Sequence, residues 1–187
     1  MPAPIISVAG GSGSGKSTFV NGFKDAVILH IDSFYKDVSE LTPLADGTYD
    51  FDNPDTIDLA ACREAAQQLS EGKDVEIPLY DYVSFKRTGT EIIKGASSGE
   101  VVVVEGLFAL YPPLNDLAML RIFIETPDEI LIARRVKRDV AKKRTAAETL
   151  EWYIKAERGY KKFVEPTKKY ANLVIPFSYS PIVFAGE

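Results

Sequence analysis

The sequence is poor in the residues that build covalent or zinc-based scaffolds. Its 187 residues include one cysteine, Cys62, and one histidine, His30. A single cysteine cannot form an internal disulfide bond, and with only one histidine beside it the set of Cys/His ligands for a zinc site is incomplete. We therefore expect neither a disulfide scaffold nor a zinc module. Cys62 is interpreted as a small helix residue rather than as a nucleophile.

Long apolar runs are also missing. No run approaches the roughly 18 residues that a membrane span needs. The first residues, MPAPIISVAG, lack the basic segment that opens a secretory signal. On these grounds we expect a cytoplasmic protein that does not bind membranes.

Positive charge is scarce overall but locally concentrated. Lys and Arg number 22 against 27 Asp and Glu, a formal net charge of −5, whereas a general nucleic-acid binder would carry a basic excess. Residues 134–144, RRVKRDVAKKR, nevertheless hold seven basic side chains against one acid. A basic cluster inside an acidic chain indicates a small anionic ligand rather than a nucleic acid.

The distribution of apolar residues predicts the fold class. Apolar types make up 45% of a chain of single-domain length, so we expect one domain over residues 1–187. Short apolar runs, separated mostly by helical segments, are expected to be strands buried on both faces. They cover residues 5–9, 26–31, 101–104, 121–125 and 172–176. This alternation predicts an α/β fold, a parallel sheet flanked by helices, with ligands at the carboxyl ends of the strands.

Local signals mark helix starts, a third being the capping-box spacing of Thr145 and Glu148, and one interruption of the alternation. Asn53-Pro54-Asp55 predicts a helix over about 56–70, and Thr126 before Pro127 predicts a second helix with Thr126 as its cap. Residues 73–94 contain two extended runs around a polar middle, which predicts a β-hairpin insertion. The hairpin is either a surface flap or a substrate lid.

The most specific local motif is GGSGSGKS at residues 10–17. It fits G-x-x-x-x-G-K-[ST] directly after the first predicted strand. In such a loop the backbone N–H groups face phosphate oxygens, Lys16 reaches the outer phosphates, and the Ser17 hydroxyl is placed for Mg²⁺. A structural Gly/Ser turn has no need of the Lys-Ser pair. The motif therefore predicts a nucleoside triphosphate with Mg²⁺, bound by Gly11, Gly13, Ser14, Gly15, Lys16, Ser17 and Thr18.

Two carboxylates are expected at the same edge of the sheet as this loop. Asp32 follows the second predicted strand, where it is placed to accept the proton of a substrate hydroxyl that attacks the γ-phosphate. Glu105 closes the run VVVVEG and is expected to hold a water on the Mg²⁺. The absence of an N-K-x-D motif disfavours a GTPase switch. The alternatives are an ordinary strand-end cap for Asp32 and a solvated strand end for Glu105.

The helix predicted after Pro127 carries an apolar and a basic stripe. The apolar stripe is Ile132, Val136 and Val140, and the basic stripe is Arg134, Arg138 and Lys142, with Arg135 between them. Basic stripes are usually solvated faces. Beside a phosphate loop, however, phosphoryl transfer needs cations in a closed site, so we expect a short basic lid over about 134–146.

With these residues, the sequence resembles the uridine/cytidine kinase branch of the phosphoribulokinase and uridine kinase family over about residues 5–176. Its motifs occur in order: GGSGSGKS, DSFYKD, FDNPDTID at 51–58, IPLYDY at 77–82, VVEG at 103–106, ARRVKRD at 133–139 and EPTKKYANLVIP at 165–176. Seven ordered motifs are far more specific than the phosphate loop alone. The resemblance implies a P-loop kinase that uses ATP and Mg²⁺ to phosphorylate the 5′-hydroxyl of a ribonucleoside.

The resemblance also implies a role for each matching residue. Asp32 would be the general base, Lys16 and Arg135 would act at the reacting phosphate, and Asp52 would hold the ribose hydroxyls. Tyr80 and Tyr82 would wall the base pocket, Tyr35 would border the substrate, and Arg138 with Lys143 or Arg144 would clamp ATP from the lid. From the residues alone, Asp52 as a helix-entry cap and the two tyrosines as hairpin packing remain open.

Two positions depart from the family pattern. Phe85 stands where the family has a histidine that hydrogen-bonds the pyrimidine edge, and Trp152 stands where it tends to have a glutamine. Loss of both polar groups should weaken discrimination between bases. Other acceptors therefore stay open, namely nicotinamide riboside, a sugar phosphate or pantothenate, as does a nucleotide-binding regulator without transferase activity. Because relatives are commonly oligomers, a homo-oligomer is a further option.

Overall fold

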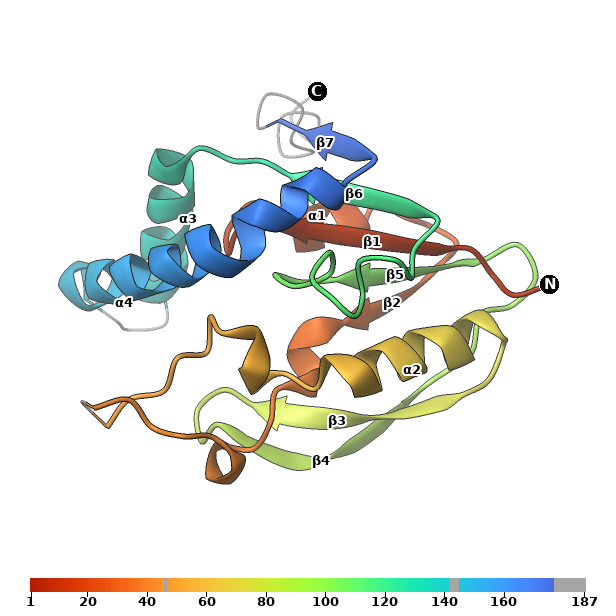
Figure 1. The fold of residues 1–187 in the computed structure, drawn as a ribbon, viewed down its shortest axis with the longest axis horizontal. Helices are drawn as coiled ribbons and strands as arrows, with labels where there is room; N and C mark the ends of the chain where they lie inside the picture. Colours follow the sequence, from red (N-terminus) through yellow and green to blue (C-terminus); the bar gives the residue numbers. More distant parts are fainter. Residues whose placement is uncertain (46, 142–144, 177–187) are drawn as a thin grey trace.

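A five-stranded parallel sheet forms the centre of the computed structural model, which describes residues 1–45, 47–141 and 145–176. The strand order is β2-β5-β1-β6-β7 (Figure 1). The strands are β1 (Ile5–Gly10), β2 (Ala26–His30), β5 (Val101–Glu105), β6 (Leu120–Ile124) and β7 (Leu173–Ile175). Each differs from its predicted range by no more than one residue at either end, and the predicted parallel α/β fold is confirmed.

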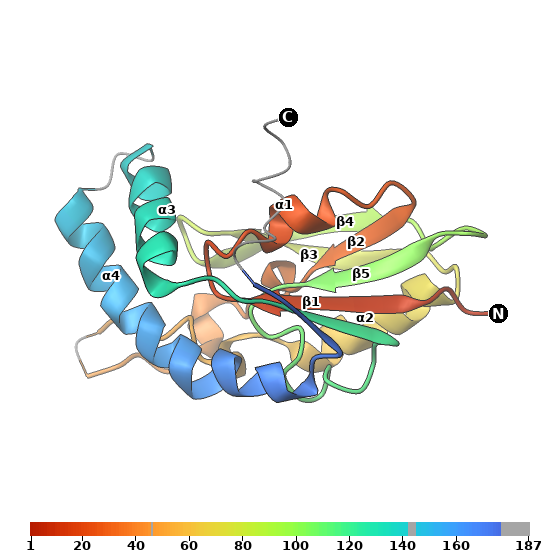
Figure 2. The same ribbon diagram turned by 90° about the horizontal axis from the view of Figure 1, so that it is seen from above.

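Each face of the sheet has its own apolar core, because alternate strand residues point to opposite sides. On one face Val8, Val103 and Ile122 pack with Val20 of the short helix α1 (Lys16–Val20). On the other face Leu29 and Val104 pack with helix α2 (Leu59–Ser70), which contributes the fully buried Cys62. Figure 2 shows α1 and α2 on opposite sides of the sheet. The interpretation of Cys62 as a small helix residue is confirmed.

Helix α2 begins later than predicted. Asn53 caps only a single 3₁₀ turn, Pro54–Thr56, by accepting a hydrogen bond from the Asp55 backbone N–H. The helix itself starts at Leu59, where the Asp58 carboxylate accepts from the backbone N–H of Ala61. The predicted start near residue 56 is therefore wrong, because two cap-like sequences lie five residues apart and each caps its own turn.

The predicted hairpin is present as strands β3 (Val75–Asp81) and β4 (Lys86–Ile93), which form a separate antiparallel sheet. It is fastened to the segment after β2. The Arg87 side chain donates hydrogen bonds to the carbonyl oxygens of Phe34 and Tyr35, and the Phe85 carbonyl accepts from Val38. These bonds hold the turn of the hairpin beside the chain that follows β2.

Helices α3 (Asp128–Ala141) and α4 (Ala146–Gly159) stand together at one end of the sheet (Figure 1). The chain continues through a π-helical turn, Tyr160–Val164, and a 3₁₀ segment, Glu165–Tyr170. In the described ranges no helix is both long and apolar enough to cross a membrane.

The packed face of α3 differs from the predicted one. Leu131 is buried with 4% of its surface exposed, whereas Ile132 and Val136 are only half-buried, and Val140 lies among the side chains that the structure does not describe. The chain is apolar at 130, 131 and 132 in succession, so spacing alone could not select the inward residue. Leu131 faces the phosphate loop, and this rotation brings Arg134 and Arg135 to the loop as well.

Candidate active site

The phosphate-binding motif forms a tight loop between β1 and α1. Gly13 and Gly15 have φ angles of 89° and 98°, in the left-handed region where other residues are strained. Three donors satisfy carbonyl oxygens of this loop: Lys16 Nζ bonds the Gly11 carbonyl at 3.0 Å, Arg134 bonds that of Gly13 at 3.1 Å, and the Thr126 hydroxyl bonds that of Ser14 at 3.2 Å. These three carbonyl oxygens accept hydrogen bonds from protein donors, so their negative ends do not face an incoming anion.

Two of these contacts were not predicted. Thr126 was expected to cap the helix and Arg134 to belong to a basic stripe, yet both bond the loop. The Ser14 hydroxyl is buried and has no hydrogen-bond partner in the described part of the chain, so it adds a polar group to the cradle. Thr18 is exposed on α1. No sequence pattern distinguishes Thr126 from an ordinary cap, because its contact depends on how β6 and β1 pair.

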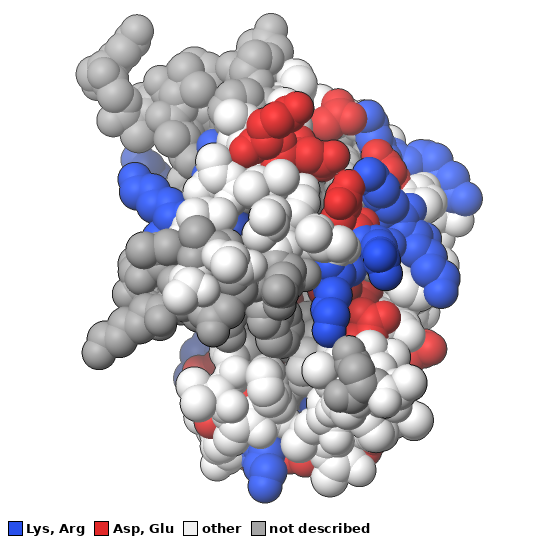
Figure 3. All heavy atoms as spheres, turned by 90° about the vertical axis from the view of Figure 1, so that its left-hand side faces the viewer, with Lys and Arg blue, Asp and Glu red and all other residues white. Residues whose placement is uncertain are grey.

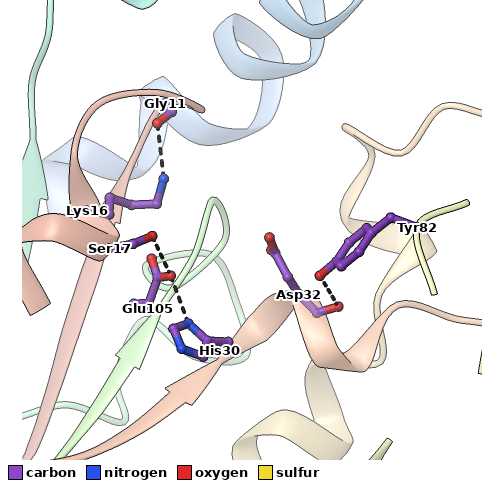
Figure 4. A network of polar contacts seen from close by, with 7 residues as sticks. All are labelled: Gly11, Lys16, Ser17, His30, Asp32, Tyr82 and Glu105. Atoms are coloured by element: carbon purple, nitrogen blue, oxygen red, sulfur yellow. Dashed lines mark hydrogen bonds and ion pairs between the residues drawn. The ribbon is translucent and has the colours of Figure 1, made fainter. Parts of the chain in front are cut away.

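Glu105 lies at the carboxyl end of β5 and is 7% exposed, which excludes the solvated strand end as its reading. Its Oε1 accepts hydrogen bonds from Ser17 Oγ at 3.1 Å and from His30 Nδ1 at 2.9 Å (Figure 4). Burial acts to raise the pKa of Glu105, but the bonds from His30 and Ser17 and the charge of Lys16 together hold it below its ordinary value. The carboxylate is therefore charged at neutral pH.

The second oxygen of Glu105 is suited to a metal ion. Oε2 is buried and has no hydrogen-bond partner within the described ranges. A buried anionic oxygen without a partner is unfavourable, and a hard divalent cation removes this penalty. Ser17 and Glu105, the predicted metal residues, are thus adjacent and chemically fit for Mg²⁺.

Asp32 lies in the 3₁₀ turn Ile31–Phe34 that follows β2. His30 occupies the cap position of that turn, so Asp32 is not the strand-end cap that was the alternative reading. Figure 4 shows its carboxylate directed into the space between the phosphate-loop residues and Tyr82. The Tyr82 hydroxyl donates to the backbone carbonyl of Asp32 at 3.4 Å. Asp32 and the phosphate loop therefore share the carboxyl edge of the sheet, as predicted.

Asp52 is placed beside helix α4 and is not a helix-entry cap, since Asn53 and Asp58 hold the two cap positions. Burial raises the pKa of Asp52 from its ordinary value of 3.8 to about 6, against the opposing charge of Arg135. Asp52 packs closely against Gly159, where an added Cβ would lie 2.4 Å from the Cβ of Asp52. This closeness follows from α4 crossing directly over the Asp52 backbone.

Asp52→Asn is expected to stabilise the protein at neutral pH. In the unfolded chain the carboxyl ionises near pH 3.8, whereas in the folded protein it ionises only near pH 6, so above pH 6 the folded state holds a buried charge. A shift of this size corresponds to about 3 kcal/mol of unfolding free energy at pH 7.5, and the advantage of the variant should shrink as the pH falls from 6 toward 4. Urea unfolding at several pH values measures it.

Asp55→Asn is the matched control, because Asp55 is an exposed carboxylate three residues away. It should show no comparable pH-dependent gain. If the Asp52 and Asp55 variants changed stability equally at every pH, burial would not be the cause of the effect.

An aromatic cluster from three segments lies between Asp52 and the hairpin. The ring centroids of Phe51 and Phe85 are 4.8 Å apart in a stacked arrangement, and Tyr35 lies 5.3 Å from Tyr80. Tyr80 also meets Tyr82 edge to face, at 5.3 Å. The Tyr35 hydroxyl donates to the Phe51 carbonyl, which fixes the chain just before Asp52. The predicted Tyr35, Tyr80, Tyr82 and Phe85 are thus brought together, and Phe51 joins them.

Phe85 and Tyr80 have distinct environments in this cluster. Phe85 has a φ of 57°, unusual for a bulky residue, and its backbone is held by the hydrogen bond from Val38. The Tyr80 hydroxyl is buried and has no hydrogen-bond partner in the described residues. Burial raises the pKa of Tyr80 to about 12, so this hydroxyl keeps its proton at neutral pH.

Arg135 joins the phosphate loop to α4. Its guanidinium carbon lies 5.7 Å from the centroid of the Tyr153 ring, and its chain packs against Gly13. Arg135, Tyr153, Gly11 and Asp52 line a small cavity of about 20 Å³, room for about one water. Asp52 also borders a second cavity of about 420 Å³, lined by Tyr49, Phe51 and α4. Neither Tyr153 nor Gly159 carries a sequence signal of its own.

Basic side chains gather on the α4 side of this end of the molecule (Figure 3). The exposed ones are Lys155, Arg158, Lys161 and Lys162. Arg138, Lys143, Arg144 and Trp152, which were predicted to clamp ATP or border the substrate, lie outside the side chains that the structure describes. The basic surface beside the cavities favours the approach of an anionic nucleotide.

Comparison with known proteins places this site in context. The model of the phosphoribulokinase / uridine kinase family matches residues 5–180. A uridine kinase of Streptococcus agalactiae is 38% identical over 188 residues, covering 96% of this chain and 89% of that protein. A uridine kinase of Borrelia duttonii is 37% identical over 180 residues, covering 92% of this chain and 85% of that protein.

Solved structures share the fold at lower identity. Phosphoribulokinase from Rhodobacter spheroides has a TM-score of 0.68 at 18% identity, covering 94% of this chain and 70% of that chain. D-glycerate 3-kinase from Cryptococcus neoformans has a TM-score of 0.66 at 15% identity, covering 95% of this chain and 87% of that chain. These likenesses concern the arrangement of the strands and helices.

Proposed function

The chain belongs to the phosphoribulokinase / uridine kinase family, and from this premise we propose that it transfers the γ-phosphate of ATP to the 5′-hydroxyl of a pyrimidine ribonucleoside. One observation carries the proposal. The chain is 37–38% identical to uridine kinases over nearly its full length. It also sets Asp32 at the same sheet edge as the phosphate loop, where an alcohol acceptor needs a base.

On the donor side, the phosphate loop binds the ATP phosphates through its backbone N–H groups and Lys16. Lys16 would leave the Gly11 carbonyl for the outer phosphates, and Arg135 would add charge at the reacting phosphoryl group. Ser17 and the water-holding Glu105 would secure Mg²⁺, which when bound neutralises charge on the β- and γ-phosphate oxygens. Arg138, Lys143 and Arg144 stay predicted clamps of ATP.

On the acceptor side, Asp32 takes the proton of the 5′-hydroxyl as that oxygen attacks the γ-phosphorus and the bond to ADP breaks. Asp52 accepts hydrogen bonds from the ribose hydroxyls, a pairing that suits two carboxylate oxygens and a vicinal diol. A cavity of about 420 Å³ also borders Asp52, lined by Tyr49, Phe51 and helix α4. The Asp52 carboxylate that is poorly solvated in the free protein would regain hydrogen-bond donors when the ribose binds.

For the base, stacking is expected to contribute more than edge recognition. Phe51, Phe85 and Tyr82 offer ring faces, whereas Phe85 has no polar group for the pyrimidine edge. The buried hydroxyl of Tyr80 supplies a polar contact in this cluster. We therefore expect uridine and cytidine to be used with similar efficiency.

A phosphate-transfer screen from labelled ATP tests the proposal. Uridine and cytidine should be phosphorylated fastest, and 2′-deoxyuridine should react about 10-fold less efficiently because one hydrogen bond to Asp52 is lost. Nicotinamide riboside, pantothenate and a pentose phosphate are the competing acceptors. Faster turnover of one of these would reassign the substrate, and ADP formation that no acceptor stimulates would point to a regulator without transferase activity.

A further inference from the structure

His30 and Glu105 are paired by the register of the sheet. The parallel ladder between β2 and β5 aligns His30 with Glu105, and each is the last residue of its strand. Because the carboxyl ends of parallel strands face the ligand edge, both side chains emerge beside the phosphate loop (Figure 4). The chain's one histidine therefore lies against the carboxylate suited to hold Mg²⁺.

The hydrogen bond between them has a defined direction. A charged carboxylate can only accept, so the ring nitrogen Nδ1 must carry a proton and donate it to Glu105 Oε1, at 2.9 Å. Ser17 donates to the same oxygen at 3.1 Å. Two donors on one oxygen fix the rotation of the carboxylate and leave Oε2, which has no hydrogen-bond partner in the described ranges, as the oxygen that remains available.

The two side chains are unequal in burial. The Glu105 side chain is 9% exposed, whereas that of His30 is 50% exposed. A half-exposed histidine at the end of the edge strand β2 adds little to the apolar core. Its hydrogen bond is thus better explained by an effect on Glu105 than by a contribution to packing.

We propose that His30 is a positioning residue that holds Glu105 through its Nδ1–H, so that the second carboxylate oxygen would be oriented toward the magnesium site of the bound nucleotide, where Glu105 would hold a metal-bound water. The inference rests on the proposed function, because it requires a magnesium nucleotide in the phosphate loop. With the Ser17 hydroxyl given to Mg²⁺, His30 would remain as the donor that restrains Glu105 Oε1. Outer partners of this kind commonly change metal affinity by about 10- to 100-fold.

The test uses two substitutions that mimic different ring nitrogens. His30→Asn places an amide nitrogen where Nδ1 lies, whereas His30→Gln places it where Nε2 lies, and His30→Ala removes both. Titration calorimetry measures ADP binding to each protein in EDTA and in saturating Mg²⁺. The dissociation constant in EDTA divided by that in Mg²⁺ gives the factor by which the metal strengthens ADP binding. This ratio needs no turnover.

We expect the ratio of the EDTA to the Mg²⁺ dissociation constant to be about 10-fold smaller in the alanine and glutamine variants than in the wild type. In the asparagine variant it should be near the wild-type value. ADP affinity in EDTA should be equal in all of these proteins. In a Glu105→Gln background, His30→Ala should have no further effect, because His30 acts through Glu105. Thermal unfolding of the metal-free variants records any change in folding separately.

Two results would overturn the inference. One is the same Mg²⁺ dependence in wild type and His30→Ala. The other is a loss that is equal in the asparagine and glutamine variants, or that persists in the Glu105→Gln background. Failure of the wild-type protein to bind ADP in either condition would overturn the proposed function as well, whereas ADP binding with an unaltered Mg²⁺ dependence would overturn this inference alone.

Discussion

Asp32→Asn is expected to lower kcat for the nucleoside acceptor by about 100-fold or more, the usual scale for a lost general base, while ATP affinity should stay close to that of the wild type. Asparagine keeps the shape of the side chain but cannot accept the proton of the 5′-hydroxyl. The carboxylate is directed into the space across from the phosphate loop (Figure 4), whose Gly11 and Gly13 carbonyl oxygens are bonded by Lys16 and Arg134. Steady-state kinetics with uridine, together with ATP binding, measures both quantities.

Asp25→Asn provides the control for this experiment. Asp25 is an exposed carboxylate immediately before β2, at the opposite end of the strand that delivers Asp32. Its replacement changes the net charge equally and should leave kcat unaltered. A turnover in the Asp32 variant equal to that of the Asp25 variant would remove Asp32 from the mechanism and leave another group as the base.

Gly159→Ala is expected to destabilise the protein by about 1 kcal/mol net and to raise the KM for the nucleoside about 10-fold or more. Gly159 has φ and ψ of −62° and −45°, so the backbone alone would favour alanine by about 1 kcal/mol. The new Cβ would lie 2.4 Å from Asp52 Cβ and 2.9 Å from the Asp52 carbonyl oxygen. Neither atom is the end of a flexible side chain, so overpacking by about 1 to 3 kcal/mol outweighs the helix preference.

Steady-state KM values for the nucleoside and for ATP distinguish a displacement of Asp52 from a general loss of stability. Displacement of Asp52 should weaken binding of the nucleoside. It should not change the KM for ATP by more than about twofold, because the phosphate loop is bonded to α3 rather than to Gly159. In an Asp52→Gly background, the alanine substitution should destabilise less, since one of the two close contacts is gone. A stability gain in Gly159→Ala would show that α4 stands farther from Asp52 than described.

The strands and the phosphate loop were predictable because their signals are local. Buried parallel strands are continuous apolar runs, and the motif at 10–17 needs a particular spacing of glycine, lysine and serine for its turn. Asp32 and Glu105 follow from the same logic, since each directly succeeds or ends a predicted strand. Parallel pairing then brings their ends to one edge without further information.

The errors came from places where local signals compete. Asn53 and Asp58 are both good caps, and only the path of the chain decides which one begins α2. Residues 130–132 near the start of α3 are all apolar, and the rotation of the helix against the phosphate loop determines that Leu131 is the buried one. Thr126 resembled a cap, yet its hydroxyl serves the Ser14 carbonyl.

The sequence by itself determined the sheet, the phosphate cradle and the edge at which the carboxylates emerge, because each depends on a pattern within about ten residues. Only the tertiary structure decided that Arg134 and Thr126 secure the cradle, that His30 bonds Glu105, and that Gly159 presses on Asp52. These contacts join segments far apart in the chain, and their geometry is set by strand register and helix rotation. Strand register and helix rotation cannot be predicted from short stretches of sequence, because both depend on how all the layers pack together.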